Sequence, residues 1–239
     1  MSAQLVDGVS MVRFDRPPVN ALDLDLLDDL IVTMRGVDGP MVLTGTGGCF
    51  SAGVDLRAVT DGGPDYTDRF LTALSAAFLA VFDHPAPVVA AINGHAIAGG
   101  CVLAMAADIR LMSAGTIGLT ELAVGAMFPM SALEICRYAM GPSVTPATLQ
   151  AQTIDVSTAA AFGWVDEVVT AQELVPRSIA LARELSEFSP AAYAMTKQQL
   201  HRPARAAIDA GAETDAIVRA SWMSDETYAR IRAYMDALH

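Results

Sequence analysis

Two glycine-containing segments could place backbone amides around an anion. The first runs from Gly45 to Leu56 (GTGGCFSAGVDL), and the second runs from Ala91 to Cys101 (AINGHAIAGGC). Glycine permits tight turns and lets a ligand approach the backbone, and a helix that begins at such a turn adds partial positive charge. Two ordinary tight turns would have the same sequence pattern. Neither segment matches GxxxxGK[ST] or GxGxxG, which argues against a nucleotide-phosphate site.

One glutamate could transfer a proton beside such an anion site. Glu121 follows the largely apolar stretch Ile117-Gly118-Leu119-Thr120. Burial disfavours the ionised form of a carboxyl group and raises its pKa, which suits a general base that works near neutral pH. A glutamate next to a threonine is also commonly a solvated or capping residue, so the sequence pattern leaves both interpretations open.

Short apolar runs predict the strands that carry these groups. Val9 to Phe14 alternates apolar and polar residues, while Pro40 to Thr44 and Pro87 to Ile92 are apolar runs. The latter two runs lead into the two glycine-containing segments, and Gly99 to Ala106 follows as a buried helix. Strand–helix units therefore predict an α/β core.

Helical spacing of leucines predicts a helix that follows the first strand. Asn20 and Asp23 are its candidate N-caps, and the apolar positions continue to Met34. Polar and glycine residues from Asp61 to Pro64 predict a loop, and the segment from Tyr66 to Phe82 has helical periodicity.

Helical patterns dominate the last third of the chain. Two further strands are expected at Ile109–Met112 and Thr116–Leu119, and helices prevail from about Leu174 onward. We therefore expect a core domain over residues 1–173 and a helical C-terminal region over residues 174–239.

Composition and charge exclude several classes of function. The chain has 239 residues, of which 53% are hydrophobic and 18% are charged, enough apolar material for a large core. The net charge of −12 is opposite to the basic surface of a nucleic-acid-binding protein. Phosphates of a ligand would therefore depend on local amides and individual arginines.

Membrane, secretory and metal-binding classes are also disfavoured. Mean hydropathy is +0.38, but polar residues and glycines interrupt the most apolar stretch, Pro85 to Ala107, before it could span a bilayer. The first residues show no secretory signal pattern, and three cysteines without CxxC spacing fit a reducing compartment. We therefore expect a cytoplasmic protein. The histidines show no metal-ligand spacing, so no metal is predicted.

The motifs in these segments resemble a known family. FSAGVDL at residues 50–56, followed about forty residues later by AAINGHAIAGGCVLAMAADIRL, is similar to the two fingerprint regions of the crotonase (enoyl-CoA hydratase/isomerase) superfamily. RPPVNAL at residues 16–22 and the run over residues 117–169 extend the resemblance over most of the chain. It implies a spiral of ββα units with a C-terminal helical region that forms homotrimers or dimers of trimers. It also implies an acyl-CoA substrate and no cofactor beyond the coenzyme A of that substrate.

The resemblance assigns two backbone amides to an oxyanion hole. The amides of Val54 and Gly99 would donate hydrogen bonds to the thioester oxygen as it becomes an enolate. Such donors contribute about 3–4 kcal/mol each where their removal has been measured in other enzymes. Further positions are expected to contact the substrate: Ala52, Gly53, Asp55, Leu56, Arg57, Gly100 and Phe128.

The resemblance also indicates which of the family's reactions the residues of this chain fit. Hydratases of this family use two glutamates, and the two positions are occupied here by Val102 and Glu121. Other members place an aspartate where this chain has Pro129. GLTELAVGAMFPM at residues 118–130 resembles the corresponding segment of Δ3,Δ2-enoyl-CoA isomerases, which work with one glutamate. A 3-enoyl-CoA isomerase that uses Glu121 as proton carrier is the leading hypothesis. Another crotonase-type reaction, such as weak hydration of an enoyl-CoA, and a non-catalytic acyl-CoA-binding protein are the alternatives.

Overall fold

Ten strands form two sheets in the computed structural model, which describes residues 1–237. The last two residues of the predicted helical region, Leu238 and His239, lie outside this range. One sheet has the order β1-β2-β3-β5-β7-β10 and the other β4-β6-β8-β9. The strands are β1 (Ser2–Val6), β2 (Val9–Phe14), β3 (Met41–Gly45), β4 (Cys49–Ser51), β5 (Val88–Ile92), β6 (His95–Ile97), β7 (Ile109–Met112), β8 (Thr116–Gly118), β9 (Thr153–Asp155) and β10 (Glu167–Val168).

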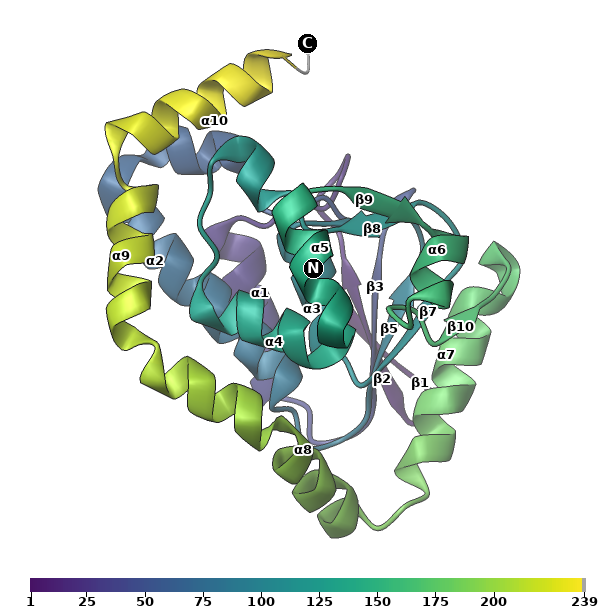
Figure 1. The fold of residues 1–239 in the computed structure, drawn as a ribbon. Coiled ribbons are helices and arrows are strands. Elements are labelled where there is room, and N and C mark those ends of the chain that lie inside the picture. Colours follow the sequence, from purple (N-terminus) through teal and green to yellow (C-terminus); the bar gives the residue numbers. More distant parts are fainter. Residues whose placement is uncertain (238–239) are drawn as a thin grey trace.

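Helices surround the sheets (Figure 1). The α-helices are α1 (Leu24–Arg35), α2 (Leu56–Phe82), α3 (Gly99–Ala106), α4 (Met130–Met140), α5 (Val144–Gln150), α6 (Val156–Ala161), α7 (Ala171–Ser186), α8 (Pro190–Ala210), α9 (Ala212–Trp222) and α10 (Asp225–Ala237). Two short 3₁₀ helices are η1 (Glu121–Val124) and η2 (Gly141–Ser143). No helix within residues 1–237 is long and apolar enough to cross a membrane.

The chain repeats a strand–strand–helix unit and places one strand of each unit in each sheet. The pairs β3–β4, β5–β6 and β7–β8 are followed by α2, α3 and, after η1, α4. β3, β5 and β7 pair in parallel in the larger sheet, while β4, β6 and β8 pair in parallel in the smaller one. This is the spiral of ββα units expected from the two fingerprint motifs.

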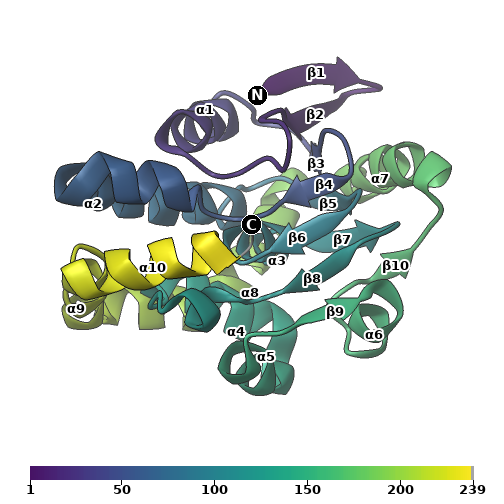
Figure 2. The ribbon, with the colours of Figure 1, turned by 90° about the horizontal axis from the view of Figure 1, so that it is seen from above.

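The larger sheet is covered on both faces. Side chains that alternate along its strands enter a main core with α1, α2, α3 and α4 on one side. On the other side, Val42, Val89 and Leu111 pack against Leu174 and Ile179 of α7. Figure 2 shows α7 beside the strands and α10 on the opposite side of the molecule. Strands buried on both faces explain the continuous apolar runs in the sequence.

Several predicted elements have the predicted bounds, and two local predictions were wrong. β2, α3 and β7 begin and end at the predicted residues. The segment from Asp61 to Pro64 belongs to α2 and is not a loop, because Gly63 absorbs a kink at φ 69° and the helix resumes at once. Asp23 caps α1 by accepting a hydrogen bond from the Leu26 amide, whereas Asn20 has another role described below.

The first helix of the C-terminal region, α7, packs directly on the larger sheet. α7 begins at Ala171 with a Thr170–Glu173 capping box and packs on β5 and β3. α8, α9 and α10 then wrap around α4 and α2 (Figure 1). The division at residue 173 stays a prediction.

Replacing Leu174 with Ala tests whether α7 belongs to the folding core. Leu174 is 2% exposed against the sheet, so the variant should lower the free energy of unfolding by about 2–4 kcal/mol. Urea unfolding monitored by circular dichroism measures this change. Leu149→Ala is the control, because Leu149 is 70% exposed and its loss should change stability by less than about 0.5 kcal/mol. Equal values for the two variants would contradict the packing role of α7.

Candidate active site

The two glycine-containing segments meet where β4 ends and α3 begins. A Cβ atom built on Gly53 would lie 3.1 Å from the Gly99 nitrogen and 2.8 Å from the Ile97 carbonyl oxygen. A Cβ atom on Gly100 would lie 2.2 Å from the Ser51 carbonyl oxygen. Gly53 also has φ +83°, a conformation that other residues rarely adopt. Only glycine therefore allows the two backbones to approach this closely.

Two amides are left without an acceptor at this contact. Gly99 is the first residue of α3, and such a residue has no carbonyl one turn earlier within its helix. Val54 forms an isolated parallel bridge with Leu22, but its neighbours supply the hydrogen bonds: Leu22 N donates to Gly53 O, and Asp55 N donates to Leu22 O. Within residues 1–237, no acceptor is found for the amide of Val54 or Gly99. Both predicted oxyanion-hole donors are thus free to bind an external oxygen.

The residue before Gly99 stores backbone strain. Ala98 has φ 50° and ψ −123°, which a residue with a side chain adopts only at a cost of about 1–3 kcal/mol. Its amide donates to the Gly118 carbonyl oxygen at 2.8 Å, so the smaller sheet fixes the turn. This turn sets the direction of the Gly99 amide at the start of α3.

A buried asparagine ties the first segment together. Asn20 is 1% exposed, and its Nδ2 donates to the carbonyl oxygens of Thr46 at 3.1 Å and Cys49 at 2.8 Å. Its Oδ1 accepts from the Arg16 amide at 2.9 Å. The Ser51 hydroxyl donates to the Asn20 carbonyl oxygen at 2.8 Å. These bonds hold the loop before α1 against the loop that leads to Val54.

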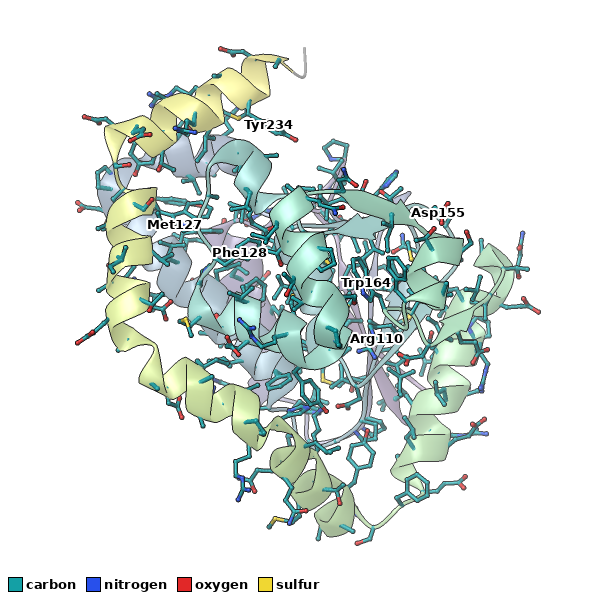
Figure 3. All side chains as sticks on the ribbon, viewed as in Figure 1. Arg110, Met127, Phe128, Asp155, Trp164 and Tyr234 are labelled. Carbon is teal, nitrogen blue, oxygen red and sulfur yellow. The ribbon has the colours of Figure 1, made fainter. Side chains whose placement is uncertain are left out.

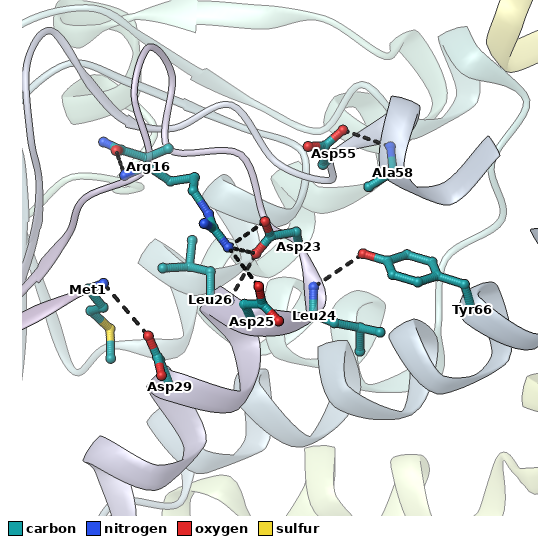
Figure 4. A network of polar contacts seen from close by, with 11 residues as sticks. Met1, Arg16, Asp23, Leu24, Asp25, Leu26, Asp29, Asp55, Ala58 and Tyr66 are labelled. Carbon is teal, nitrogen blue, oxygen red and sulfur yellow. Dashed lines mark hydrogen bonds and ion pairs between the residues drawn. The ribbon is translucent and has the colours of Figure 1, made fainter. Parts of the chain in front are cut away.

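Polar contacts also surround the starts of α1 and α2, and one of them joins the start of α1 to a later turn of α2 (Figure 4). Arg16 pairs with Asp23 at 2.6 Å, and the Leu24 amide donates to the Tyr66 hydroxyl at 3.3 Å. Asp55 caps α2 by accepting from the Ala58 amide at 2.9 Å. Asp55, predicted to bind substrate, therefore also has a structural role beside the Val54 amide.

Glu121 brings a carboxyl group to the same region. It is the first residue of η1, three residues after Gly118, whose carbonyl accepts from Ala98. Its Oε2 is buried and has no hydrogen-bond partner among the described residues. Burial raises the pKa of Glu121 to about 8, although the amides of Glu121 and Thr120 oppose the shift. Burial raises the pKa of Cys101 in the first turn of α3, and the nearby Glu121 carboxylate adds to that shift.

The position where the family's hydratases have their other glutamate holds Val102, whose side chain cannot transfer a proton. Val102 is fully buried in α3, and its amide donates to the Ala98 carbonyl oxygen at 3.0 Å. Its side chain belongs to the main hydrophobic core. Of the two glutamate positions of the family's hydratases, only the one at Glu121 therefore carries a carboxyl group in this chain.

The remaining predicted substrate contacts surround this geometry. Ala52 donates its amide to the Val19 carbonyl oxygen at 2.9 Å, so that amide is already used. Leu56 is half-buried at the start of α2, and Arg57 beside it is exposed. Phe128 is half-buried between η1 and α4 and packs against the main core (Figure 3). The contacts of these residues with a substrate stay predictions.

Sequence reasoning missed residues that position the site. Asn20 was expected as a helix cap, but its positive φ of 51° and buried bonds make it a tie between loops. Ser51 and Ala98 carried no separate signal, because their roles depend on which backbone lies next to them. The one hint in the sequence was that Asn20 lies in a loop that contains two consecutive prolines.

A cleft of about 720 Å³ lies elsewhere, between α4 and α8. Among its charged groups, Lys197 pairs with Asp108 at 2.8 Å, and Arg110 pairs with Asp166 at 2.8 Å. None of its lining residues belongs to the two glycine-containing segments or to η1. The chemistry described above is therefore separate from this cleft.

Comparisons with known proteins agree on one family. A family model described as enoyl-CoA hydratase/isomerase matches residues 4–236. A probable enoyl-CoA hydratase of Mycobacterium leprae is 30% identical over 83% of this chain and 80% of its own. A solved enoyl-CoA isomerase of Mycobacterium tuberculosis is 32% identical, with a TM-score of 0.82 over 90% of this chain and 97% of its own.

A human structure shows the same fold. Human mitochondrial Δ3,Δ2-enoyl-CoA isomerase superposes with a TM-score of 0.90 at 24% identity, over 97% of this chain and 94% of its own. The crotonase fold expected from the fingerprint motifs is confirmed. Names for hydratases and isomerases both occur among the similar proteins.

Replacing Asn20 with Ala should destabilise the protein. The carbonyl oxygens of Thr46 and Cys49 would lose the Asn20 donor, and Cys49 would keep only a longer bond from Asn93 Nδ2 at 3.4 Å, so the free energy of unfolding should fall by about 2–4 kcal/mol. Urea unfolding measures the loss. Gln198→Ala, at an exposed position of α8, should change stability by less than about 0.5 kcal/mol. A loss no larger than that of this control would refute the role of Asn20.

Replacing Glu121 with Gln should raise thermal stability more at pH 8.5 than at pH 5. Folding raises the pKa of Glu121 from 4.5 to about 8, so the folded wild type binds the proton more tightly than the unfolded chain. The wild type therefore loses stability as pH rises from about 4.5 to about 8, while glutamine does not titrate. Melting temperatures at both pH values measure the gap. Glu213→Gln, at an exposed site, is the control, and a gap independent of pH would contradict the buried carboxyl group.

Proposed function

Because this chain belongs to the enoyl-CoA hydratase/isomerase family, we propose that it moves the double bond of a 3-enoyl-CoA thioester to form the conjugated 2-enoyl-CoA. One observation carries the proposal. Within residues 1–237, the buried Oε2 of Glu121 has no partner and the amides of Val54 and Gly99 have no acceptor, while the other glutamate position of the family's hydratases holds the buried Val102. One proton carrier and an oxyanion hole are sufficient to shift a double bond. A mycobacterial protein with the same fold is named an enoyl-CoA isomerase in one solved structure and a probable enoyl-CoA hydratase in another, so the choice of reaction depends on the residues of this chain.

The geometry suggests a role for each group. The ionised Glu121 removes a proton from C2, and the electron pair of the broken C–H bond spreads toward the thioester oxygen. The amides of Val54 and Gly99 donate to that oxygen, and the start of α3 adds partial positive charge. Protonated Glu121 then returns the proton to C4, so that the double bond lies between C2 and C3. The reaction needs no cofactor beyond the coenzyme A of the substrate.

The pKa of Glu121 suits both halves of this reaction. A base with a pKa near 8 binds a proton more tightly than an ordinary glutamate, yet is ionised in part at neutral pH. Its Oε2 has no partner among the residues that the structure describes, so the oxygen that would take the proton is available. Water addition would need a second group to hand a proton to the acyl chain, and Val102 offers none. Hydration is therefore the weaker alternative, as is binding without catalysis.

We further propose that the protein is a cytoplasmic homotrimer or dimer of trimers. Large apolar side chains are exposed on α8 and just before it: Phe188 is 61%, Met195 54% and Leu200 57% exposed. A subunit interface would remove them from water. Light scattering coupled to size-exclusion chromatography gives the mass directly, and a monomer at micromolar concentration would overturn this proposal.

The proposed reaction is tested with purified protein and a 3-enoyl-CoA. Formation of the conjugated 2-enoyl-CoA is followed by its ultraviolet absorbance, with Glu121→Gln measured in parallel. The variant should lose at least about 100-fold in kcat, because glutamine cannot accept the proton. In the wild type, kcat/KM should rise with pH through about 8 and then level, since the ionised form of Glu121 is the active one.

Two controls separate the alternatives. Loss of absorbance from a 2-enoyl-CoA would indicate hydration, and thioester binding without conversion of either substrate would indicate a binding protein. Glu213→Gln should retain wild-type turnover because Glu213 is exposed on α9. Full activity of Glu121→Gln would refute the assigned role.

A further inference from the structure

The segment that follows Glu121 is held in place by the C-terminal helix α9. It runs from Gly125 to Pro129 and joins η1 to α4. The Ala126 amide donates to the Glu121 carbonyl oxygen at 3.0 Å, so the segment is bonded directly to the backbone of the proposed proton carrier. In Figure 3, Met127 and Phe128 of this segment lie toward the side where α9 packs. Displacement of the segment would therefore move Glu121.

Trp222 at the end of α9 makes one bond to this segment. Its indole Nε1–H donates to the Met127 carbonyl oxygen at 2.8 Å. The indole is buried at 2% exposure, so water cannot replace the bond without disturbing the packing. The acceptor is the residue directly after Ala126. A chain of two backbone-anchored bonds therefore links Trp222 to the main chain of Glu121.

Asp215 makes a second bond at the other end of the segment. Its Oδ1 accepts from the Met130 amide at 2.8 Å. α4 begins at Met130, and the preceding Pro129 has no side-chain group that could cap the helix. Asp215 therefore supplies from α9 the cap that α4 lacks, and its charge is favourable at a helix N-terminus.

A third contact comes from α10. A Cβ atom built on Gly125 would lie 2.8 Å from Cδ of Arg230, so the stem of this side chain lies over the first residue of the segment. α10 also packs against η1 itself and against α2. The C-terminal helices of the same chain thus contact both ends of the segment.

We propose that Trp222 and Asp215 are positioning residues, which fix the position of Glu121 relative to the Val54 and Gly99 amides by holding the segment from Gly125 to Pro129. The kinetic test of this inference depends on the proposed function, whereas the stability test does not. The held segment keeps water from the Glu121 Oε2, which is buried and has no partner within residues 1–237. When it is released, water solvates the carboxylate and the carboxyl group moves relative to the amides. Small misplacement of a reacting group can cost about 100-fold in rate.

The chain offers a matched pair for the test, because it contains two tryptophans. Trp164 is also 2% exposed, and its Nε1–H donates to the Ser143 hydroxyl at 2.6 Å. Trp164 lies on the side of α5 away from α9 (Figure 3). Trp222→Phe and Trp164→Phe each remove one buried indole bond and keep an aromatic ring. A purely structural role predicts equal effects for the two variants.

The kinetic experiment compares kcat and KM for the 3-enoyl-CoA. Trp222→Phe should lower kcat by about tenfold with KM within about twofold of wild type, because the substrate-binding amides are unchanged. Trp164→Phe should retain kcat. Asp215→Ala should behave like Trp222→Phe, whereas Asp215→Asn keeps an oxygen acceptor for the Met130 amide and should restore most of kcat. Equal kcat for all four variants and wild type would overturn the inference.

A second experiment needs no enzymatic activity. Glu121→Gln is introduced into wild type, Trp222→Phe and Trp164→Phe, and melting temperatures are measured at pH 5 and pH 8.5. If Trp222 keeps water from Glu121, the pH-dependent gain from Glu121→Gln should shrink in the Trp222→Phe background and persist in the Trp164→Phe background. An unchanged gain in both backgrounds would refute the inference even if the wild type converts no 3-enoyl-CoA. Should Trp222→Phe fail to fold, the Asp215→Ala and Asp215→Asn pair gives the same comparison.

Discussion

The close approach of Gly53 to Gly99 is the constraint on which the site depends. With a Cβ on Gly53, that atom would lie 3.1 Å from the Gly99 nitrogen and would occupy the space beside the free amide. The spiral of ββα units brings these positions together, because β4 and β6 pair in parallel and end at the same edge of the smaller sheet. The strained Ala98 and the buried Asn20 then fix the two turns. The proposed oxyanion hole would therefore be a consequence of the fold and would need no polar side chain.

Local electrostatics also explain how an acidic chain could use a carboxylate as a base. The net charge of −12 would repel a phosphate-bearing substrate at long range. At short range, free amides and the start of α3 favour negative charge on the thioester oxygen. Burial raises the pKa of Glu121 to about 8, which makes its carboxylate a stronger base than that of an exposed glutamate. Once Glu121 has taken the proton it is neutral and does not repel an enolate.

Much of the core could be predicted from the sequence because its signals are local. Strands buried on both faces appear as apolar runs, and β2, α3 and β7 were found at their bounds. A loop was predicted at Asp61 to Pro64 because glycine and proline signal a break, whereas in the structure the break is a kink at Gly63, where two helical stretches of α2 meet. Strands as short as β10 have too few residues to show a period.

The sequence by itself determined the family, the positions of the two amides, and the presence of Glu121 with Val102 in place of a second glutamate. It determined them because residue types and spacing along two motifs suffice to identify these groups. Only the tertiary structure decided that the Val54 and Gly99 amides lack acceptors within residues 1–237, that the Glu121 Oε2 is buried there without a partner, and that Trp222 bonds to the segment that follows Glu121. These properties arise between residues far apart in the chain, where the folded backbone, and no local pattern, sets the distance and excludes water.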